Sequence, residues 1–596
     1  MKSFVLFVVI DLCFGTVAGH FQLQIVHNND MHARFAETDK FSASCPSDYA
    51  KNNQCYGGYA RTKQAAVDAI EEANKRNISS IFLNAGDSFQ GTPYYTIYKW
   101  KIVAPLVDAL GIDVMSLGNH EFDDGIDNLV EYLNHLKTPV VACNLNLSSE
   151  SRLNVRNLMP SVVLNVNGHS IGVIGYLTPD TKFLSNTENL EIFDEIPKLK
   201  EEAKRLKAKG VKIIIGLGHS GFEKDIKIAQ EVDDISLVVG GHSHSLLYSP
   251  KDKPPSSENV VASYPYIVTQ KSGKIVPVVQ AYAFTKYIGK LMVTFDDDGN
   301  VISATGNTVV LDSSFGKDSS IDKEVGIWTA SLRQRLGVVK GYTRVFLQKS
   351  NFLTNEFESN IMNLVTDAIV DSGVEISKQM NVTQWTNAPL AAYQNGGIRS
   401  TIDNIKNGGA ITLEDILTLL PFKDALYICS VPGFVLKESL EFSVSKYDKT
   451  NKFNYLHYFI NYSGLRVVYN LNKPPGNRVE NIKVICTNCF KPKYEAFDEK
   501  KIYNVILTSF LIKGGDNFFM FSKHITDKQK LNITDTDVLI SYIEKMKIVY
   551  PIIDGRIVVN GFQENTSAAH GINVSFCLIF LMCVVSSIRY TYYFII

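Results

Sequence analysis

The chain contains 596 residues and has a mass of 66.5 kDa, which is more than one hydrophobic core usually serves, so we expect at least two domains. Hydrophobic residues make up 45% of the chain and charged residues 20%, as in ordinary globular proteins. The formal net charge of -1 leaves no basic excess, which argues against a nucleic-acid-binding protein.

The N-terminus has the pattern of a cleavable secretory signal. Lys2 precedes an apolar run over residues 4–14, and small residues follow it up to Gly19. We therefore expect residues 1–19 to be a signal peptide and the mature chain to begin near His20. A buried first helix of a cytosolic domain is the alternative interpretation.

Apolar runs alternate with amphipathic helical patterns between residues 20 and 311, which predicts an α/β domain. The helical patterns cover residues 61–74, 126–136 and 197–209. The predicted strands are 21–27, 81–85, 114–117, 139–142, 171–176, 211–217 and 235–239.

Polar clusters follow five of these strands, and the carboxyl ends of strands are where α/β sheets usually place their sites. A single Asp or His in a loop is usually solvated or caps a helix, but five clusters in one domain favour a shared metal site. Carboxylate, imidazole and amide oxygen are suitable ligands for zinc, manganese or iron. The clusters contain Asp30 and His32, then Asp87, then Asn119, His120 and Asp123, then His219, and finally His242 and His244.

The chain changes character over residues 312–338, where charged residues lead into a helical pattern at 325–336. We expect this segment to be a linker helix between two domains. Residues 339–560 then alternate helical and strand-like patterns again, which predicts a second, mixed α/β domain. Its predicted helices are 361–370, 413–420 and 433–445, and its predicted strands are 390–393, 426–431, 465–469 and 502–507.

Cysteines and glycosylation sequences fit an oxidising compartment. Cys45 and Cys55 flank a polar loop, and Cys486 and Cys489 bracket two residues, so two local disulfides are expected. A zinc half-site is the alternative for the second pair. Six sequons agree with a secreted glycoprotein, namely those at Asn77, Asn146, Asn381, Asn461, Asn532 and Asn565.

The C-terminal segment 561–596 has the pattern of a lipid-anchor signal. Residues 574–588 carry no charge, but this run is shorter than the ~20 residues that span a bilayer as a helix. Ser567 and the two alanines after it precede this run with a short polar spacer, as in a GPI attachment signal whose tail is removed. A single-pass membrane tail is the alternative.

The strand-end motifs as a set resemble the calcineurin-like metallophosphoesterase superfamily, and nearly the whole chain resembles the ecto-5'-nucleotidase and apyrase family. This resemblance implies a four-layer α/β sandwich joined by the linker helix to a mixed α/β nucleotide-binding domain. It also implies that rotation near the linker helix moves substrate between an open and a closed arrangement.

The resemblance implies two divalent metal ions. Zinc is the first choice, with manganese, cobalt, magnesium or calcium as alternatives. Two cations about 3.5 to 4 Å apart bind phosphoryl oxygens and lower the pKa of a bound water for in-line attack. The implied ligands are Asp30, His32, Asp87 and His244 for one ion, and Asp87, Asn119, His219 and His242 for the other, with Asp87 bridging.

The resemblance further implies that His120 stabilises charge on the phosphoryl group and that Asp123 orients its imidazole. Arg34 could add a phosphate contact. In the second domain it implies an amide for the base from Asn395, a guanidinium for phosphate from Arg399, stacking rings from Phe422 and Phe510, and a carboxylate for ribose from Asp516. A structural His–Asp pair, core phenylalanines and a Gly-Gly-Asp turn are the alternative interpretations.

Two positions depart from the family pattern. Met362 stands where relatives commonly have glycine, and Asn355 stands where many 5'-nucleotidases have a phosphate-binding arginine. Asn355 weakens the expected phosphate clamp of the second domain to Arg399.

The sequence therefore predicts an extracellular, metal-dependent 5'-nucleotidase that acts on AMP-like monophosphates and is anchored at the cell surface or secreted. Its partners would be extracellular purine nucleotides and the membrane, with a homodimer left open. Apyrase activity on ATP and ADP is the first alternative. A nucleotide- or receptor-binding protein without turnover is a second alternative, and a phosphoesterase for cyclic nucleotides or nucleotide sugars is a third.

Overall fold

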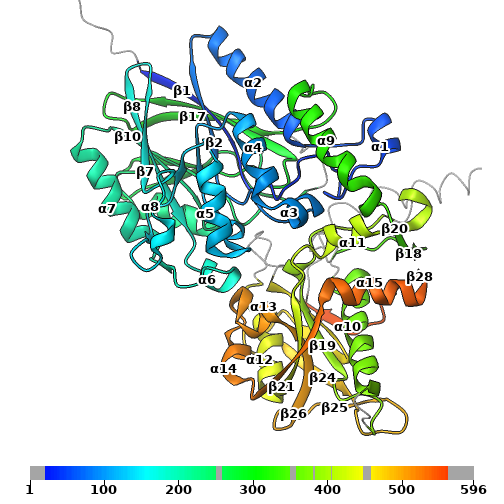
Figure 1. Ribbon diagram of the computed structural model, residues 1–596. Coiled ribbons are helices and arrows are strands. Elements are labelled where there is room, and N and C mark those ends of the chain that lie inside the picture. The colour runs from blue at the N-terminus through cyan, green and yellow to red at the C-terminus, as the bar shows by residue number, and fades with distance from the viewer. Residues whose placement is uncertain are drawn as a thin grey trace, which may run out of the picture.

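The computed structural model describes residues 20–249, 258–349, 357–379, 383–403, 406–447 and 458–561 (Figure 1). The expected signal peptide, the expected anchor signal with Ser567, and Asn355 lie outside these residues. Within the described ranges, no helix is long and apolar enough to cross a membrane. Two parts are visible in Figure 1: an N-terminal part that runs from β1 to β17, and a C-terminal part that runs from β18 to β29.

The N-terminal part is built on two sheets, as the alternation of strand and helix patterns predicts. In the first sheet β1, β2, β3, β4 and β6 run parallel, while β16 and β17 add antiparallel strands at one edge. In spatial order this sheet contains β17 (Val301–Val310), β16 (Tyr287–Phe295), β1 (Phe21–Asn28), β2 (Ser79–Asn84), β3 (Val114–Ser116), β4 (Val140–Val141) and β6 (Leu158–Met159).

The second sheet is parallel at its centre, where β15, β11, β10 and β8 pair, and antiparallel at both edges. Its strands in spatial order are β14 (Tyr266–Thr269), β15 (Ile275–Val279), β11 (Leu237–Val239), β10 (Ile213–His219), β8 (His169–Leu177) and β7 (Ser161–Val166). Two short pairs complete this part: β5 (Leu145–Asn146) with β9 (Glu191–Ile192), and β12 (Leu246–Leu247) with β13 (Val260–Ala262).

Side chains on the two faces of β1 show how the layers pack. Leu23 and Ile25 join a core that also contains Ile215 of β10, so the two sheets pack face to face. Val26 points into another core, which the first sheet shares with helices on its outer side. Other helices cover the outer face of the second sheet, and Figure 1 shows the resulting four layers. The covering helices are α2 (Tyr59–Lys75), α4 (Trp100–Leu110) and α5 (Gly125–His135) on the first sheet, and α7 (Glu195–Ala208) and α8 (Phe222–Glu231) on the second.

The connecting helix α9 (Ser319–Leu336) packs on the N-terminal part. Val325 and Leu332 belong to the same core as the inner face of α2, and Leu417 of α11 reaches that core from the C-terminal part. The helix starts before the predicted range of 325–336, because the Asp318 carboxylate accepts hydrogen bonds from the first backbone N–H groups and caps it.

The C-terminal part is built on a five-stranded sheet with a core on each face. Ala391 and Tyr393 of β19 (Leu390–Gln394) face one core, and Leu390 and Ala392 face the other. Its strands in order are β22 (Ile460–Ser463), β19 (Leu390–Gln394), β26 (Ile502–Thr508), β21 (Ala425–Pro432) and β27 (Asp527–Thr534).

Two smaller sheets and several helices flank this sheet. The four-stranded sheet contains β25 (Tyr494–Ala496), β24 (Val479–Ile485), β23 (Leu465–Asn470) and β29 (Ile557–Asn560), and the three-stranded sheet contains β20 (Ala410–Thr412), β18 (Val339–Thr343) and β28 (Ile548–Val549). The helices are α10 (Asn360–Gln379), α11 (Leu413–Leu419), α12 (Gly433–Ser443), α13 (Ser509–Ile512), α14 (Phe519–His524) and α15 (Asp535–Met546).

The mixed α/β class is confirmed, and each predicted strand and helix is present. Their bounds agree within a few residues, except that α9 begins earlier and α10 ends later than predicted. Among the elements of the N-terminal part that the sequence patterns missed are β14 to β17, α4 and α8. The domain boundaries at residues 311 and 338 stay predictions.

Met362 is buried in α10, where its side chain fills the core beside the central sheet.

Both expected disulfides, Cys45–Cys55 and Cys486–Cys489, are present, whereas Cys143 and Cys429 are free. One expectation needs correction. Asn461 lies on β22 with no exposed surface, so a folded chain cannot carry a glycan there. The sequons at Asn381 and Asn565 lie outside the described residues.

Candidate active site

The predicted metal residues gather at one edge of the sandwich. Asp30, Asp87 and Asn119 follow the carboxyl ends of the parallel strands β1, β2 and β3, while His219 ends β10 and His242 follows β11. Because the two sheets pack face to face, these loops meet above both of them.

The backbone of this edge adopts uncommon conformations. Left-handed φ values occur at Asp30, His32, Asp87, His242 and His244, between 47° and 78°. Such conformations cost about 1 to 3 kcal/mol each and gather at functional sites. A glycine is required at Gly118, because a Cβ atom there would lie 2.1 Å from Asp87 Oδ1.

One group of donor atoms centres on Asp30, His32 and His244. The Nε2 atoms of the two histidines lie 3.0 Å apart, and His244 Nε2 lies 3.2 Å from Asp30 Oδ1. Asp30 and His32 have no exposed surface. These three residues form a cluster whose ligand atoms are close enough to hold one metal ion.

A second group lies beside it and centres on Asp87, whose Oδ2 atom also lies 3.8 Å from His32 Nε2 of the first group. His219 Nε2 lies 2.9 Å from Asp87 Oδ2 and 3.7 Å from Asp30 Oδ1, so these three side chains also form a candidate metal cluster. His242 Nδ1 lies 2.9 Å from the amide oxygen of Asn119. His120 approaches from the other side, with Nε2 4.0 Å from Asp87 Oδ2. Asp87 therefore stands at the centre of both groups.

The donor set fits divalent cations. Burial and the nearby Arg399 hold the pKa of His32 well below its ordinary value, and burial lowers the pKa of His242 to about 3, so both imidazoles keep a lone pair for a metal. The Nε2 atom of His219 is buried and lies against the carboxylates of Asp87 and Asp30. Although burial opposes it, the carboxylates of Asp87 and Asp30 raise the pKa of His219 to about 10, which shows that this point attracts positive charge.

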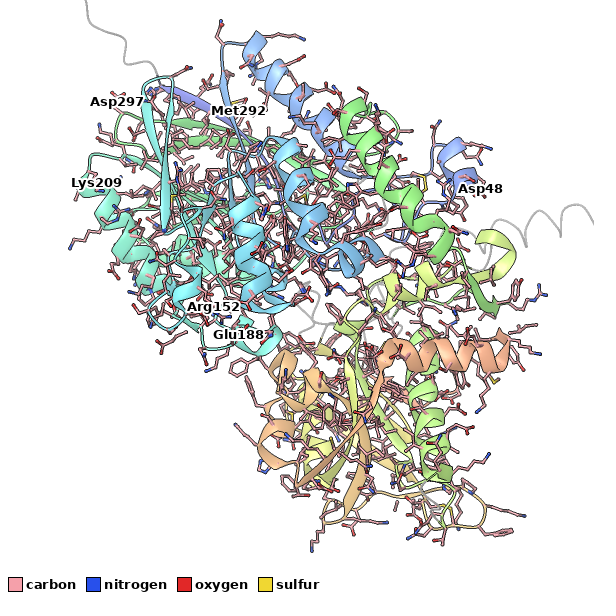
Figure 2. All side chains as sticks on the ribbon, viewed as in Figure 1. Asp48, Arg152, Glu188, Lys209, Met292 and Asp297 are labelled. Atoms are coloured by element: carbon pink, nitrogen blue, oxygen red, sulfur yellow. A yellow bond between two sulfur atoms is a disulfide. The ribbon has the colours of Figure 1, made fainter. Side chains whose placement is uncertain are left out.

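His120 is oriented by a chain of hydrogen bonds. Its Nδ1 lies 2.8 Å from Asp123 Oδ2, and Ser185 donates to the other oxygen of Asp123 at 2.6 Å. The loop that carries Ser185 is fastened by an ion pair of 2.6 Å between Arg152 and Glu188, which lie side by side in Figure 2. Although burial opposes it, Asp123 and Asp87 raise the pKa of His120, which favours the charged imidazolium.

Glu121 has a role that the sequence did not indicate. Its carboxylate is fully buried and accepts four backbone hydrogen bonds, from Asp87, Ser88, Phe89 and Gly118, at 2.6 to 3.1 Å. It therefore binds the loop after β2 to the loop after β3. A glutamate beside a candidate catalytic histidine was the only signal in the sequence.

Arg34 lies beneath the cluster. Its guanidinium donates to the carbonyls of His32 at 3.0 Å and Ser42 at 3.3 Å, and it packs 4.7 Å from the ring of Phe284. Only Nη2 has no partner, and the side chain is 1% exposed. Most of its hydrogen-bonding capacity therefore supports the loop rather than an exposed phosphate site.

Two side chains of the C-terminal part reach the metal cluster. Arg399 Nη2 lies 3.1 Å from His32 Nε2, and the Phe422 ring stacks on His120 with centroids 5.5 Å apart. The Arg399 guanidinium also lies 5.5 Å from the Phe422 ring. The predicted residues of both parts thus form one continuous site.

The remaining predicted residues of the C-terminal part carry unpaired polar atoms, partly exposed rings or a carboxyl group with a shifted pKa. The amide nitrogen and oxygen of Asn395 are buried without a hydrogen-bond partner, so both atoms are available to bind a ligand. Phe422 and Phe510 are partly exposed, unlike core phenylalanines. Burial raises the pKa of Asp516 to about 7, while the charges of Arg399 and His120 oppose this shift.

Asp424 is a further residue that the sequence did not indicate. Its partly buried carboxylate accepts a hydrogen bond from Ser509 Oγ at 2.6 Å, and it also interacts with the backbone N–H of Phe510. Burial raises the pKa of Asp424 to about 6. Asp424 therefore holds the start of α13 and with it the ring of Phe510.

The two-sheet sandwich with its Asp–His cluster defines a phosphoesterase of the metal-dependent class. The family model for calcineurin-like phosphoesterases matches residues 23–246, and the model for the C-terminal domain of 5'-nucleotidases matches residues 339–523. The fold of the first family implies divalent metal ions. The chain belongs to the 5'-nucleotidase family.

Relatives match nearly the full length. A protein of Lutzomyia longipalpis is 40% identical over 578 residues, which cover 96% of this chain and 99% of the relative. The 5'-nucleotidase of Mus musculus is 39% identical and covers 91% of both chains. The crystal structure of the 5'-nucleotidase precursor from Thermus thermophilus has a TM-score of 0.78 at 28% identity and covers 91% of this chain and 100% of the other.

Proposed function

We propose that this protein hydrolyses the 5'-phosphate of nucleoside monophosphates such as AMP, with nucleoside and phosphate as products. The observation that carries this proposal is the distance of 3.1 Å between Arg399 Nη2 and His32 Nε2. It brings a guanidinium of the C-terminal part, which is suited to bind phosphate, to the candidate metal cluster of the N-terminal part. Relatives named 5'-nucleotidase over 91% of the chain support the same activity.

In this proposal two divalent ions, with zinc as the first choice, occupy the cluster. Asp30, His32, Asp87 and His244 would hold one, and Asp87, Asn119, His219 and His242 the other. The bound ions would supply Lewis acidity toward the phosphoryl oxygens and an acidified water.

The residues around the cluster position the phosphoryl group. The His120 imidazolium, fixed by Asp123, donates through Nε2 to a phosphoryl oxygen and stabilises the charge that develops in the transition state. The Arg399 guanidinium neutralises negative charge on the phosphate. As the water oxygen bonds to phosphorus and gives up a proton, the bond between phosphorus and the 5'-oxygen breaks in line, and the 5'-oxygen takes up a proton and leaves as the nucleoside hydroxyl.

The C-terminal part recognises the nucleoside. Phe422 and Phe510 accept the base between or beside their rings, which is worth about 1 to 3 kcal/mol per stacked base. The unpartnered amide of Asn395 hydrogen-bonds the base edge, and Asp516 accepts from the ribose hydroxyls.

We propose that the protein acts outside the cell, with a cleaved N-terminal signal and an anchor attached near Ser567. The two disulfides support an oxidising compartment. Loss of residues 1–19 and release of the protein from cells by a phospholipase that cleaves GPI anchors would test this location.

A substrate panel tests the activity. Purified protein with zinc or manganese added is incubated separately with AMP, ADP and ATP, and phosphate is measured. We expect release from AMP. Phosphate from ADP and ATP but none from AMP would show an apyrase instead, and no release from any nucleotide would favour a binding protein.

A further inference from the structure

Gln280 is a buried glutamine that contacts the loop of His242 and His244. It directly follows β15, the parallel neighbour of β11, and β11 leads into that loop. Its side chain has no exposed surface. A buried amide is unfavourable unless its polar atoms are hydrogen-bonded, so the partners of Gln280 indicate its role.

All four hydrogen-bonding positions of the Gln280 amide are filled. Its Nε2 donates to Asp225 Oδ2 at 2.8 Å and to the carbonyl oxygen of Gly241 at 3.0 Å. Its Oε1 accepts from Ser243 Oγ at 3.1 Å and from the backbone N–H of Ser245 at 3.2 Å. These partners fix the orientation of the amide, because the reversed amide would place its oxygen against a carboxylate and a carbonyl.

Three of the four partners alternate with the candidate ligands along the loop. One partner precedes His242, one separates the two histidines, and one follows His244. Both histidines have left-handed φ values, of 78° and 50°. Such conformations cost about 1 to 3 kcal/mol each and persist only where surrounding contacts hold them. Gln280 supplies these contacts and thereby fixes the backbone that carries both imidazoles.

Asp225 connects Gln280 to the second sheet. Its buried carboxylate also accepts a hydrogen bond from the hydroxyl of Tyr176 of β8 at 2.7 Å. The loop backbone passes so close to this carboxylate that a Cβ atom at Gly240 would lie 1.8 Å from Asp225 Oδ2. Tyr176, Asp225 and Gln280 therefore form one chain of hydrogen bonds from the sheet to the loop.

We propose that Gln280 is a positioning residue that sets the affinity of the cluster for its metal ions. It acts through the loop of His242 and His244, which supplies one imidazole to each of the two proposed ions. Without the amide the loop can adopt other conformations, and a metal ion would have to restore the ordered one, which weakens binding. The inference rests on the proposed function, since it takes both histidines as metal ligands.

The test replaces Gln280 with methionine, which has a similar volume and no amide. Manganese is titrated into the metal-free protein by calorimetry, because manganese binds more weakly than zinc and its dissociation constant is easier to measure. We expect this constant to rise by about 10- to 100-fold in Gln280→Met, as is usual when a partner that orients metal ligands is lost. At limiting manganese, kcat for AMP should fall while KM for AMP stays unchanged.

Gln270→Met is the matched control. Gln270 is another buried glutamine of the second sheet, and its Nε2 donates to the carbonyls of Ala229 at 2.8 Å and Val232 at 3.1 Å, beside the end of α8. The control should lower the thermal stability but leave the dissociation constant for manganese unchanged. An equal rise of this constant in both variants would overturn the inference, because it would reflect a general loss of stability.

Ser243→Ala provides a second variant that should fold, because Ser243 is exposed and only one of the four contacts of Gln280 is removed. We expect a smaller rise of the dissociation constant in this variant. An unchanged constant in a folded Gln280→Met would overturn the inference. If Gln280→Met does not fold, an unchanged constant in Ser243→Ala would overturn it. Manganese affinity that depends on Gln280 in a protein that releases no phosphate from AMP would support the inference and reject the proposed function.

Discussion

The Nη2 atom of Arg399 lies 3.1 Å from the Nε2 atom of His32, although the two residues belong to different parts of the chain. The structure is therefore in a conformation in which the proposed nucleotide-binding side chains of the C-terminal part meet the candidate metal cluster. Arg399→Ala should lower kcat/KM for AMP by about 10- to 100-fold, because one charge-assisted contact to phosphate is lost. Arg399→Lys should recover only part of this loss, because a lysine lacks the planar fork.

Steady-state kinetics with AMP checks this prediction, and bound metal measured in parallel provides the control. Equal activity in Arg399→Ala and the unmodified protein would exclude a phosphate contact. A loss of metal in the variant would instead mean that Arg399 supports the cluster.

Asp123 should act through His120 rather than through the metal ions. Its carboxylate contacts the imidazole at 2.8 Å and Ser185 at 2.6 Å. Asp123→Asn should therefore lower kcat by about 10- to 100-fold, as is usual for a residue that orients a functional histidine, and should leave bound metal unchanged. Ser185→Ala should give a smaller effect in the same direction. A rise in KM without a fall in kcat would contradict this role.

The sequence indicated most of the residues that gather at this edge, because the candidate metal ligands follow directly after strands whose apolar character is evident. Asp30, Asp87 and His219 could thus be placed at the carboxyl ends of strands from the order of residues alone. Glu121 and Asp424 were missed because their roles depend on tertiary contacts: each carboxylate accepts hydrogen bonds from segments that only the folded chain brings near. Local patterns also carry no information on the approach of Arg399 to His32.

Arg34 illustrates the opposite limit. A basic residue beside Asp30 and His32 suggested a phosphate contact, but the fold directs its guanidinium to backbone carbonyls. The Arg34 guanidinium is buried under the ring of Phe284, so it contacts backbone carbonyls instead of an exposed phosphate site.

The two partly exposed phenylalanines should determine nucleoside affinity. Phe422→Ala and Phe510→Ala should each raise KM for AMP by the equivalent of about 1 to 3 kcal/mol, with a smaller change for hydrolysis of a substrate that lacks a base. Phe434→Ala is the control, since this side chain is 44% exposed and belongs to α12. Equal effects on substrates with and without a base would show that the rings serve the fold.

Arg556 links two segments of the C-terminal part and should make stability depend on pH. It contacts Asp367 of α10 at 2.8 and 3.1 Å and Asp554 at 3.0 Å. Although burial opposes it, hydrogen bonds from Arg556 lower the pKa of Asp554. The contribution is therefore complete above the usual Asp pKa of about 3.9 and is lost as the pH falls through the lower folded-state value.

Thermal unfolding of the unmodified protein and of Arg556→Met between pH 3 and pH 7 checks this sign. The difference in Tm should be largest near neutral pH and should shrink in acid. Lys473→Met, which removes an exposed ion pair with Glu480, is the control and should change Tm little at any pH. A difference that grows as the pH falls would contradict the assignment.

Asp87 stands at the centre of both donor groups, so its replacement tests the account most directly. The release of phosphate and adenosine from AMP is measured together with bound metal. The three metal-loaded proteins are the unmodified protein, Asp87→Asn and the control Asp297→Asn. Asp297 is an exposed residue far from the C-terminal part (Figure 2). We predict equimolar products for the unmodified protein and the control, and loss of both turnover and metal for Asp87→Asn. Full activity in Asp87→Asn would contradict the proposed site, and the absence of phosphate from AMP with all three proteins would contradict the proposed function.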